Sequence, residues 1–417
     1  MTSGLPINIA RLQAEIDELA TFSEAPAPAV TRVLFSAEDQ KARAWLTERF
    51  RAAGLVLRHD AVGNLFARWE GSQPDLAAVA TGSHTDAIPN AGKYDGVLGV
   101  LGALEAFRAL RESGFKPVRS LEIMMFTSEE PTRFGLGCLG SRLLSGALSP
   151  EQALALRSKQ GESLTELKTQ AGYAEDLELK SVRLSKDVYR AFLELHIEQG
   201  PLLERDGLDI GAVEKIAAPS AFRFRLEGSG GHAGGTLMPG RRDALLAAAE
   251  IALAVEKAAL ESGSPDTVAT TGVLTIEHGE INSIPCRALL EIDLRDTNMQ
   301  TRKKAFDAIQ QATTEICARR RIECRFESIN SDPPATCDPD LVELILGEAE
   351  TNRLKARRQI SRAYHDSLFM ALICPTAMIF IPCRNGYSHR PDEYSSPEQI
   401  AAGVQVLGGV LRQMASA

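Results

Sequence analysis

Residues 121–130 read LEIMMFTSEE, a short apolar run that ends in two adjacent carboxylates. A run of this length bounded by polar residues is typical of a buried β-strand. Helical apolar spacing precedes it at residues 39–53 and 97–113, and another short apolar run stands at 78–81. Because helix and strand patterns alternate, the sequence predicts α/β layers. In such sheets ligands bind beyond the carboxyl ends of the strands, so polar groups at strand exits mark the expected site.

The pattern changes twice along the rest of the chain. A charged, Leu-rich segment at residues 144–186 is interpreted as a solvated helical insertion. From about residue 211 the expected order is β-α-β-β-α-β, which is typical of a small ferredoxin-like α+β domain. The run IFIPC at 379–383 suits a central buried strand, so the chain must return to the first domain. We therefore expect a mixed-sheet α/β catalytic domain flanked by helices and built from residues 1–211 and 330–417, with an inserted domain at 212–329.

Composition narrows the class of protein. The 417 residues include 46 basic and 55 acidic side chains, so no basic surplus exists to neutralise nucleic acid. The seven cysteines show no CxxC pair and no regular spacing, which predicts reduced thiols. The N-terminus lacks a basic region followed by an apolar core, and the most apolar stretch, 370–383, is broken by two prolines and falls short of the roughly 20 residues of a membrane span. We expect a cytoplasmic enzyme without a membrane segment.

Five of the seven histidines stand in Gly-rich or acidic segments that follow apolar runs. In GSHTD, His84 is followed two residues later by Asp86, whose carboxylate can fix the tautomer of a metal-bound imidazole. Asp95 lies in a second acidic turn, KYDG, that opens a helix. Taken alone, such a His-x-Asp pair is more typical of a surface contact than of a metal site.

Other strand exits carry similar groups. Glu129 and Glu130 point in opposite directions in an extended chain, so one carboxylate can bind metal while the other serves as a general base. His389 follows the run IFIPC. Strand alternation directs three polar residues of the next strand to one face: Glu194, His196 and Glu198.

Together these side chains form a nitrogen and oxygen donor set that suits zinc, manganese, cobalt or nickel. The chain has no GxSxG elbow, no GxGxxG directly after a strand and no GxxxxGK[ST] loop. The simplest serine hydrolase, dinucleotide and P-loop interpretations are therefore excluded, and metal-assisted hydrolysis is favoured. A non-catalytic binding protein on a decayed hydrolase fold would require a missing ligand or base, and none is missing.

Six motifs in order carry a family resemblance: GSHTDAIPNAGKYDGVLGV, FTSEEPTRFG, LELHIEQGP, GGHAGGTLMPGRRDA, NSIP with EIDLRD, and GYSHRPDEYSSPE. Together they resemble the amidase, hydantoinase and carbamoylase branch of the M20 metallopeptidase superfamily. That branch cleaves ureido or amide C–N bonds. The segment that begins SRAYHDSLFMA is most similar to the ureidoglycolate amidohydrolases of this branch, where allantoate and carbamoyl-amino-acid enzymes usually have a smaller GAGHDA-type segment.

The resemblance implies a site for two divalent metal ions, manganese first, with zinc, cobalt or nickel as alternatives. Asp95 would bridge the two ions, Asp86 would orient one ligand, and Glu129 would be the general base. The implied metal ligands are His84, Asp95, Glu130, His196 and His389.

The same motifs imply the substrate contacts. Arg295 would bind the substrate carboxylate, and His232 would stabilise the oxyanion from the inserted domain of a partner subunit. The full implied set is Gln199, His232, Asn282, Arg295, Tyr364 and His365. Read without the motifs, Gln199 could be a loop cap, Asn282 a turn residue and Arg295 a surface strand residue. The bulk of Arg362 and Tyr364 predicts a small substrate.

We therefore expect an amidohydrolase that acts on a small anionic ureido compound. Ureidoglycolate is the first expectation, with release of ammonia, carbon dioxide and glyoxylate in purine and allantoin catabolism. Allantoate and N-carbamoyl-L-amino acids are the alternatives, because both carry a carboxylate beside a ureido nitrogen. The inserted domain is expected to act as a lid and to form a homodimer.

Overall fold

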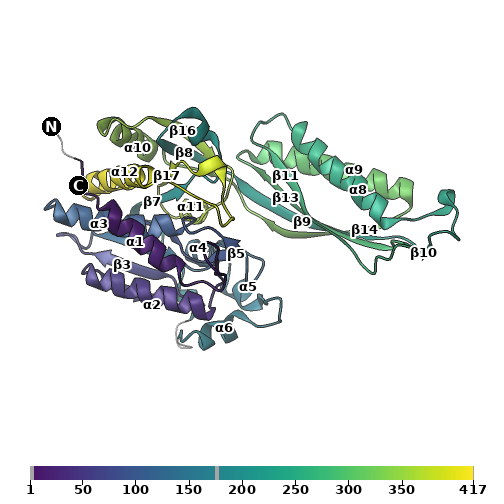
Figure 1. The fold of residues 1–417 in the computed structure, drawn as a ribbon, viewed down its shortest axis with the longest axis horizontal. Helices are drawn as coiled ribbons and strands as arrows, with labels where there is room; N and C mark the ends of the chain where they lie inside the picture. Colours follow the sequence, from purple (N-terminus) through teal and green to yellow (C-terminus); the bar gives the residue numbers. More distant parts are fainter. Residues whose placement is uncertain (1–3, 174–177, 417) are drawn as a thin grey trace. The chain divides into compact units, whose positions relative to one another are not determined.

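The computed structural model describes residues 4–173 and 178–416, which divide into two compact units. The first unit comprises residues 1–214, 336–359 and 365–417, and the second comprises residues 215–335 and 360–364. Each unit has its own core, and Figure 1 shows the helices and strands that form it. The mixed α/β class that the sequence predicts is confirmed.

The first unit is built on a mixed sheet whose strand order is β15-β8-β17-β7-β4-β6-β3-β2, with β16 also paired to β8. The four central strands, β17, β7, β4 and β6, run parallel to one another, and the flanking strands β8 and β3 are antiparallel to them. Every residue of β4, β6 and β17 is buried, as expected for parallel strands covered on both faces. The strands are β2 (Val56–His59), β3 (Leu65–Trp69), β4 (Ala78–His84), β6 (Leu121–Phe126), β7 (Tyr189–Ile197), β8 (Ile210–Ile216), β15 (Ala335–Thr336), β16 (Ala356–Ser361) and β17 (Thr376–Ile381).

Helices cover this sheet, and Figure 1 shows α12 and α3 beside it. Helix α3 packs on β4 and β7, and α12 packs on α3 and β17. Two short strands, β1 (Val30–Arg32) and β5 (Ala87–Ala91), form a separate antiparallel pair. The helices of this unit are α1 (Ile9–Ala20), α2 (Ala37–Ala52), α3 (Val97–Glu112), α4 (Leu139–Ser145), α5 (Pro150–Ala155), α6 (Leu164–Gln170), α7 (Leu202–Asp206), α10 (Pro339–Thr351), α11 (Asp366–Met370) and α12 (Pro397–Ala415).

The segment at residues 144–186 is less solvated than the sequence predicts. Its helices α5 and α6 begin at complete capping boxes, which explains their short, well-defined starts. Their charged residues are largely exposed, but Leu164, Leu167 and Val182 are buried in the cluster that contains Phe126 and Phe192. The insertion therefore contributes to the core through its leucines. Residues 174–177 of this segment lie outside the described residues.

The second unit is a four-stranded antiparallel sheet in the order β11-β13-β9-β14, with two helices on one face. The observed order β9, α8, β11, β13, α9, β14 is the one that the sequence predicts. The two helices are α8 (Ala244–Leu260) and α9 (Met299–Arg320). The sheet strands are β9 (Ala218–Glu227), β11 (Val268–Ile276), β13 (Arg287–Asp296) and β14 (Glu323–Ser331), and a small pair is formed by β10 (Gly231–His232) and β12 (Ser283–Ile284). None of the described helices is both long enough and apolar enough to cross a membrane.

Candidate metal centre

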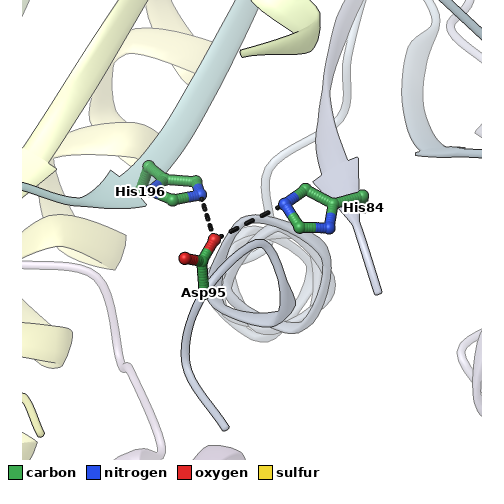
Figure 2. Close-up of side chains that lie close together, drawn as sticks. All are labelled: His84, Asp95 and His196. Atoms are coloured by element: carbon green, nitrogen blue, oxygen red, sulfur yellow. Dashed lines mark ion pairs between the residues drawn. The ribbon is translucent and has the colours of Figure 1, made fainter. Parts of the chain in front are cut away.

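Two histidines and one aspartate meet where the parallel strands β4 and β7 end. Asp95 Oδ1 lies 3.5 Å from His84 Nε2 and 3.2 Å from His196 Nε2. Figure 2 shows the carboxylate between the two imidazoles, beside the start of α3. All three side chains are buried. Strand register explains the approach, because β4 and β7 are paired neighbours whose carboxyl ends share one edge of the sheet.

A glycine makes this approach possible. Gly96 follows Asp95 and has a φ of 65°, in the left-handed region that favours glycine. A Cβ atom added at Gly96 would lie 2.4 Å from His84 Nε2. Any side chain at this position would therefore displace the imidazole.

A second group shares the same aspartate. The other carboxylate oxygen of Asp95, Oδ2, lies 3.5 Å from His389 Nε2, and that nitrogen lies 3.2 Å from Glu130 Oε1. In each group the candidate ligand atoms lie within 4.8 Å of one another. The structure thus brings all five predicted metal ligands together, in two groups joined by Asp95.

The imidazoles present the tautomer that a metal requires. His84 Nδ1 donates to the backbone carbonyl of Asp86 at 3.0 Å, and His196 Nδ1 donates to the carbonyl of Ile197 at 2.9 Å. Since Nδ1 donates in both rings, Nε2 is the nitrogen that faces Asp95 and would be the atom that binds a metal ion. Burial lowers the pKa of His84, but Glu129 and the neighbouring aspartates outweigh it and hold that pKa well above its usual value. The site is therefore strongly negative and suits a cation.

Asp86 acts differently from the sequence-based expectation. Its carboxylate Oδ1 is 3.6 Å from His84 Nδ1, whereas its backbone carbonyl makes the closer contact. The carboxylate accepts hydrogen bonds from the backbone N–H groups of Glu129 and Glu130, at 3.2 and 3.1 Å. Asp86 thus holds the His84 imidazole through its backbone carbonyl and the loop of the two glutamates through its carboxylate.

Glu129, the predicted general base, lies inside the site. Its Oε2 is 3.8 Å from His84 Nε2, and its Oε1 accepts a hydrogen bond from Cys138 Sγ at 3.6 Å. Burial, together with nearby carboxylates, raises the pKa of the Glu129 carboxyl well above its usual value. Glu130 turns the other way, toward His389. The two glutamates therefore face different histidines of the candidate site.

A layer of polar residues surrounds Asp95. Gln199 Nε2 donates to Asp95 Oδ2 at 2.7 Å, so this predicted substrate residue contacts a candidate metal ligand here. Ser388 Oγ donates to the same oxygen. The Glu393 carboxylate accepts from the N–H groups of Tyr94 and Asp95, and burial raises the pKa of Glu393 to about 7. Sequence reasoning missed Ser388 and Glu393, although both stand in the motif GYSHRPDEYSSPE.

A buried network lies against His196. Glu194 accepts hydrogen bonds from Ser83 Oγ at 2.7 Å and Ser367 Oγ at 2.6 Å, linking β7 to β4 and α11. The His365 ring centroid lies 4.6 Å from that of His196. His365 is only 2% exposed. The structure therefore buries this predicted substrate residue against His196, a candidate metal ligand.

Glu198 contacts the start of the next helix. It follows the end of β7, where strand alternation stops, and its carboxylate accepts from the N–H groups of Leu202 and Leu203 at the start of α7.

The remaining predicted residues belong to the second unit, at two places. His232 in β10 pairs with Ser283 in β12, and the Asn282 carbonyl accepts from Ala233 N–H. His232 Nδ1 accepts from the N–H groups of Gly234 and Gly235, so its neutral ring carries the proton on Nε2. Arg295 lies near the other end of β13, with its guanidinium carbon 5.3 Å from the Tyr364 ring centroid.

Comparison with known proteins decides the family. Residues 80–413 match the model of peptidase family M20/M25/M40. The chain belongs to the M20 family. It is 54% identical over 99% of its length to a ureidoglycolate hydrolase of Arabidopsis thaliana, covering 88% of that protein. It is 38% identical to an N-carbamoyl-L-amino acid amidohydrolase of Geobacillus stearothermophilus, covering 97% of this chain and 98% of that one.

A solved structure agrees over the whole chain. The crystal structure of AtUAH in complex with glyoxylate matches with a TM-score of 0.92 at 53% identity, covering 99% of both chains. The resemblance drawn from the six motifs is thereby confirmed. The chain is a hydrolase of the M20 family, which depends on metal, and the buried histidines and carboxylates described above fit that requirement.

Proposed function

We propose that this protein hydrolyses the ureido C–N bond of ureidoglycolate and releases ammonia, carbon dioxide and glyoxylate, as a step of purine nitrogen catabolism. One observation carries the proposal: the shared-aspartate site, with Glu129 beside it, occurs in a chain that matches a ureidoglycolate hydrolase over 99% of its length. The Arg295 guanidinium provides the planar fork that suits the carboxylate of such a substrate.

Two divalent ions would be held by the two groups of ligands. His84 and His196 would hold one, Glu130 and His389 the other, and Asp95 would contribute one oxygen to each. Manganese is the proposed ion. When bound, such ions lower the pKa of a water molecule and polarise a carbonyl group.

The proton is handled by Glu129. Its carboxylate is buried, faces the side of His84 that carries Nε2, and has an elevated pKa. A carboxyl of this kind can accept a proton from the attacking water and return it to the leaving nitrogen. Cys138, whose thiol donates to the other oxygen, would keep the carboxylate in that orientation.

His232 would donate Nε2–H to the oxyanion, and it would do so in the site of a partner subunit. Within the second unit, His232 pairs with Ser283, four residues before β13 begins, and Arg295 lies near the end of β13. Eight residues separate Arg287 from Arg295 along β13, which corresponds to roughly 26 Å of extended strand. One small substrate cannot contact both residues of one chain, so the two would serve different sites.

The second unit offers a surface for a second copy of the chain. Leucines recur every seven residues along the exposed side of α8, and Leu253 and Leu260 are 67% and 81% exposed. The adjacent strand β11 is an edge of the sheet and exposes Val273 and Leu274. An apolar stripe beside an unpaired strand edge is suited to a symmetric interface. We therefore propose a homodimer formed through this unit.

We also propose a cytoplasmic location, because the buried cysteine thiols suit a reducing compartment.

Allantoate and N-carbamoyl-L-amino acids remain the second candidates, since the Geobacillus relative has 38% identity over the same length. Bulk at Tyr364 favours the smaller substrate, because a wall rejects a larger molecule by overlap.

The test is turnover of all three substrates by manganese-loaded protein, measured as ammonia release. We expect kcat/KM for ureidoglycolate to exceed that for allantoate by about 10²-fold or more. Tyr364→Gly should lower ureidoglycolate turnover and admit allantoate. A wild-type preference for allantoate or for an N-carbamoyl amino acid would overturn the substrate assignment.

A further inference from the structure

Arg295 is held by a neighbour on its own strand. Asp293 and Arg295 stand two residues apart on β13, so both side chains lie on the same face of the sheet. Buried residues such as Leu294 alternate with them and belong to the core under the helices, so this pair lies on the opposite, open face. Arg295 Nε and Nη2 donate to the two carboxylate oxygens of Asp293 at 2.8 and 2.9 Å. The contact is bidentate.

Two further contacts restrain the same guanidinium. The Tyr364 ring lies 5.3 Å from Arg295 Cζ, a cation–π distance. The carbonyl of Arg362 lies 3.5 Å from Arg295 Nη1. Both residues belong to the segment 360–364. This segment is part of the second unit, although residues 336–359 and 365–417 on either side of it belong to the first.

We propose that Asp293 is a positioning residue that fixes the guanidinium of Arg295 for the carboxylate of the substrate. The inference rests on the proposed function, which gives Arg295 that carboxylate to bind. A guanidinium is planar, so the bidentate contact of its Nε–Nη2 edge with Asp293 fixes the plane of the whole group. Orientation in advance reduces the freedom that an arginine loses when its ligand binds.

The direction in which Asp293→Asn changes carboxylate binding distinguishes a positioning role from an effect of charge alone. Asp293 carries a negative charge that opposes the binding of an anion at Arg295. If charge were its main effect, Asp293→Asn would strengthen carboxylate binding. If positioning is its main effect, the same substitution weakens binding, because the amide replaces one of the two acceptor oxygens with an NH2 donor and the bidentate contact is lost.

The strand supplies a matched control. Glu291 lies two residues before Asp293 on the same open face and pairs with Arg223 at 2.6 Å. Glu291→Gln removes an equivalent charge from the same sheet face without touching Arg295. Any general effect of charge or of sheet stability should appear in both variants.

The experiment measures glyoxylate binding by calorimetry and ureidoglycolate kinetics on the manganese-loaded full chain. For Asp293→Asn we expect the glyoxylate Kd and the ureidoglycolate KM to rise roughly three- to tenfold, with kcat within about twofold of wild type. Glu291→Gln should match wild type in both. Asp293→Glu, which keeps the charge but shifts the carboxylate, should also raise KM and covers the case in which the asparagine variant does not fold.

Failure of this inference is distinct from failure of the proposed function. A wild-type chain that neither binds glyoxylate nor turns over ureidoglycolate would overturn both. A wild-type chain that does so, with Asp293→Asn binding glyoxylate as tightly as Glu291→Gln or more tightly, would overturn the positioning role alone. A fall in kcat at unchanged KM would also overturn it.

Discussion

Asp95 is the residue on which both halves of the metal centre depend. One oxygen faces His84 and His196, and the other faces His389 and accepts hydrogen bonds from Gln199 and Ser388. Burial opposes its charge, but the contacts with His196 and His84 hold the pKa of Asp95 well below its usual value. The carboxylate is therefore ionised and directed by its neighbours before any cation arrives.

At the residue scale, Glu129→Gln should abolish turnover without loss of metal, because Glu129 faces the reacting water and Glu130 faces His389. We expect kcat to fall by about 10²-fold or more, as is typical when a general base is removed. Metal content, measured by plasma mass spectrometry, should stay at the wild-type level. Glu130→Gln is the matched control and should lose metal. Near-normal kcat in the Glu129 variant, or metal loss there, would show that the two roles are misassigned.

The five ligand candidates could be predicted from the sequence because each stands at a strand exit or a helix start within a recognisable motif. The contacts of Asp86, Gln199 and Glu198 could not be predicted in the same way. Each depends on where the chain turns after its strand: Asp86 reaches the backbone of the glutamate loop, and Glu198 caps α7. Glu393 holds Tyr94 and Asp95 across almost 300 positions of sequence. A contact between residues so far apart in the sequence cannot be predicted from the residues on either side of each partner.

At the element scale, helix α3 connects the core to the site. Most of its residues are buried against β4, β7 and α12, and Asp95 directly precedes its N-cap, Gly96. The helix itself was predictable from its apolar spacing. The contribution of the 144–186 insertion to the core was not predictable. Its many charged residues suggest a solvated segment, and the burial of its leucines is visible only in the folded chain.

Gly96→Ala should weaken metal binding because the added Cβ would overlap the His84 ring. Gly114, just beyond the other end of α3, is a matched control: its φ is 81°, and no atom lies within 4 Å of an added Cβ. Both variants should lose about 1–2 kcal/mol of unfolding free energy from the left-handed backbone, and the overlap with His84 adds to that loss in Gly96→Ala alone. Only Gly96→Ala should also show weaker manganese affinity by titration calorimetry. Equal affinities in the two variants would contradict the close-contact account.

At the scale of the whole molecule, the proposed homodimer would complete each site with His232 of the partner subunit. Glu129→Gln and His232→Ala should each be inactive alone. When the two are refolded together, half of the dimers are mixed, and each mixed dimer contains one site with both residues intact. We expect about one quarter of wild-type activity from the mixture. Activity no higher than that of the separate variants would show that His232 serves its own chain.

The measurement that tests the central claim most directly is the number of manganese ions bound per chain, compared with turnover. The account predicts about two ions in the wild type, about one in His389→Ala and fewer than one in Asp95→Ala, with ureidoglycolate hydrolysis lost in both variants. A wild-type chain that holds a single ion at its full rate of turnover, or an Asp95→Ala variant that retains two ions, would contradict a centre built on a shared aspartate.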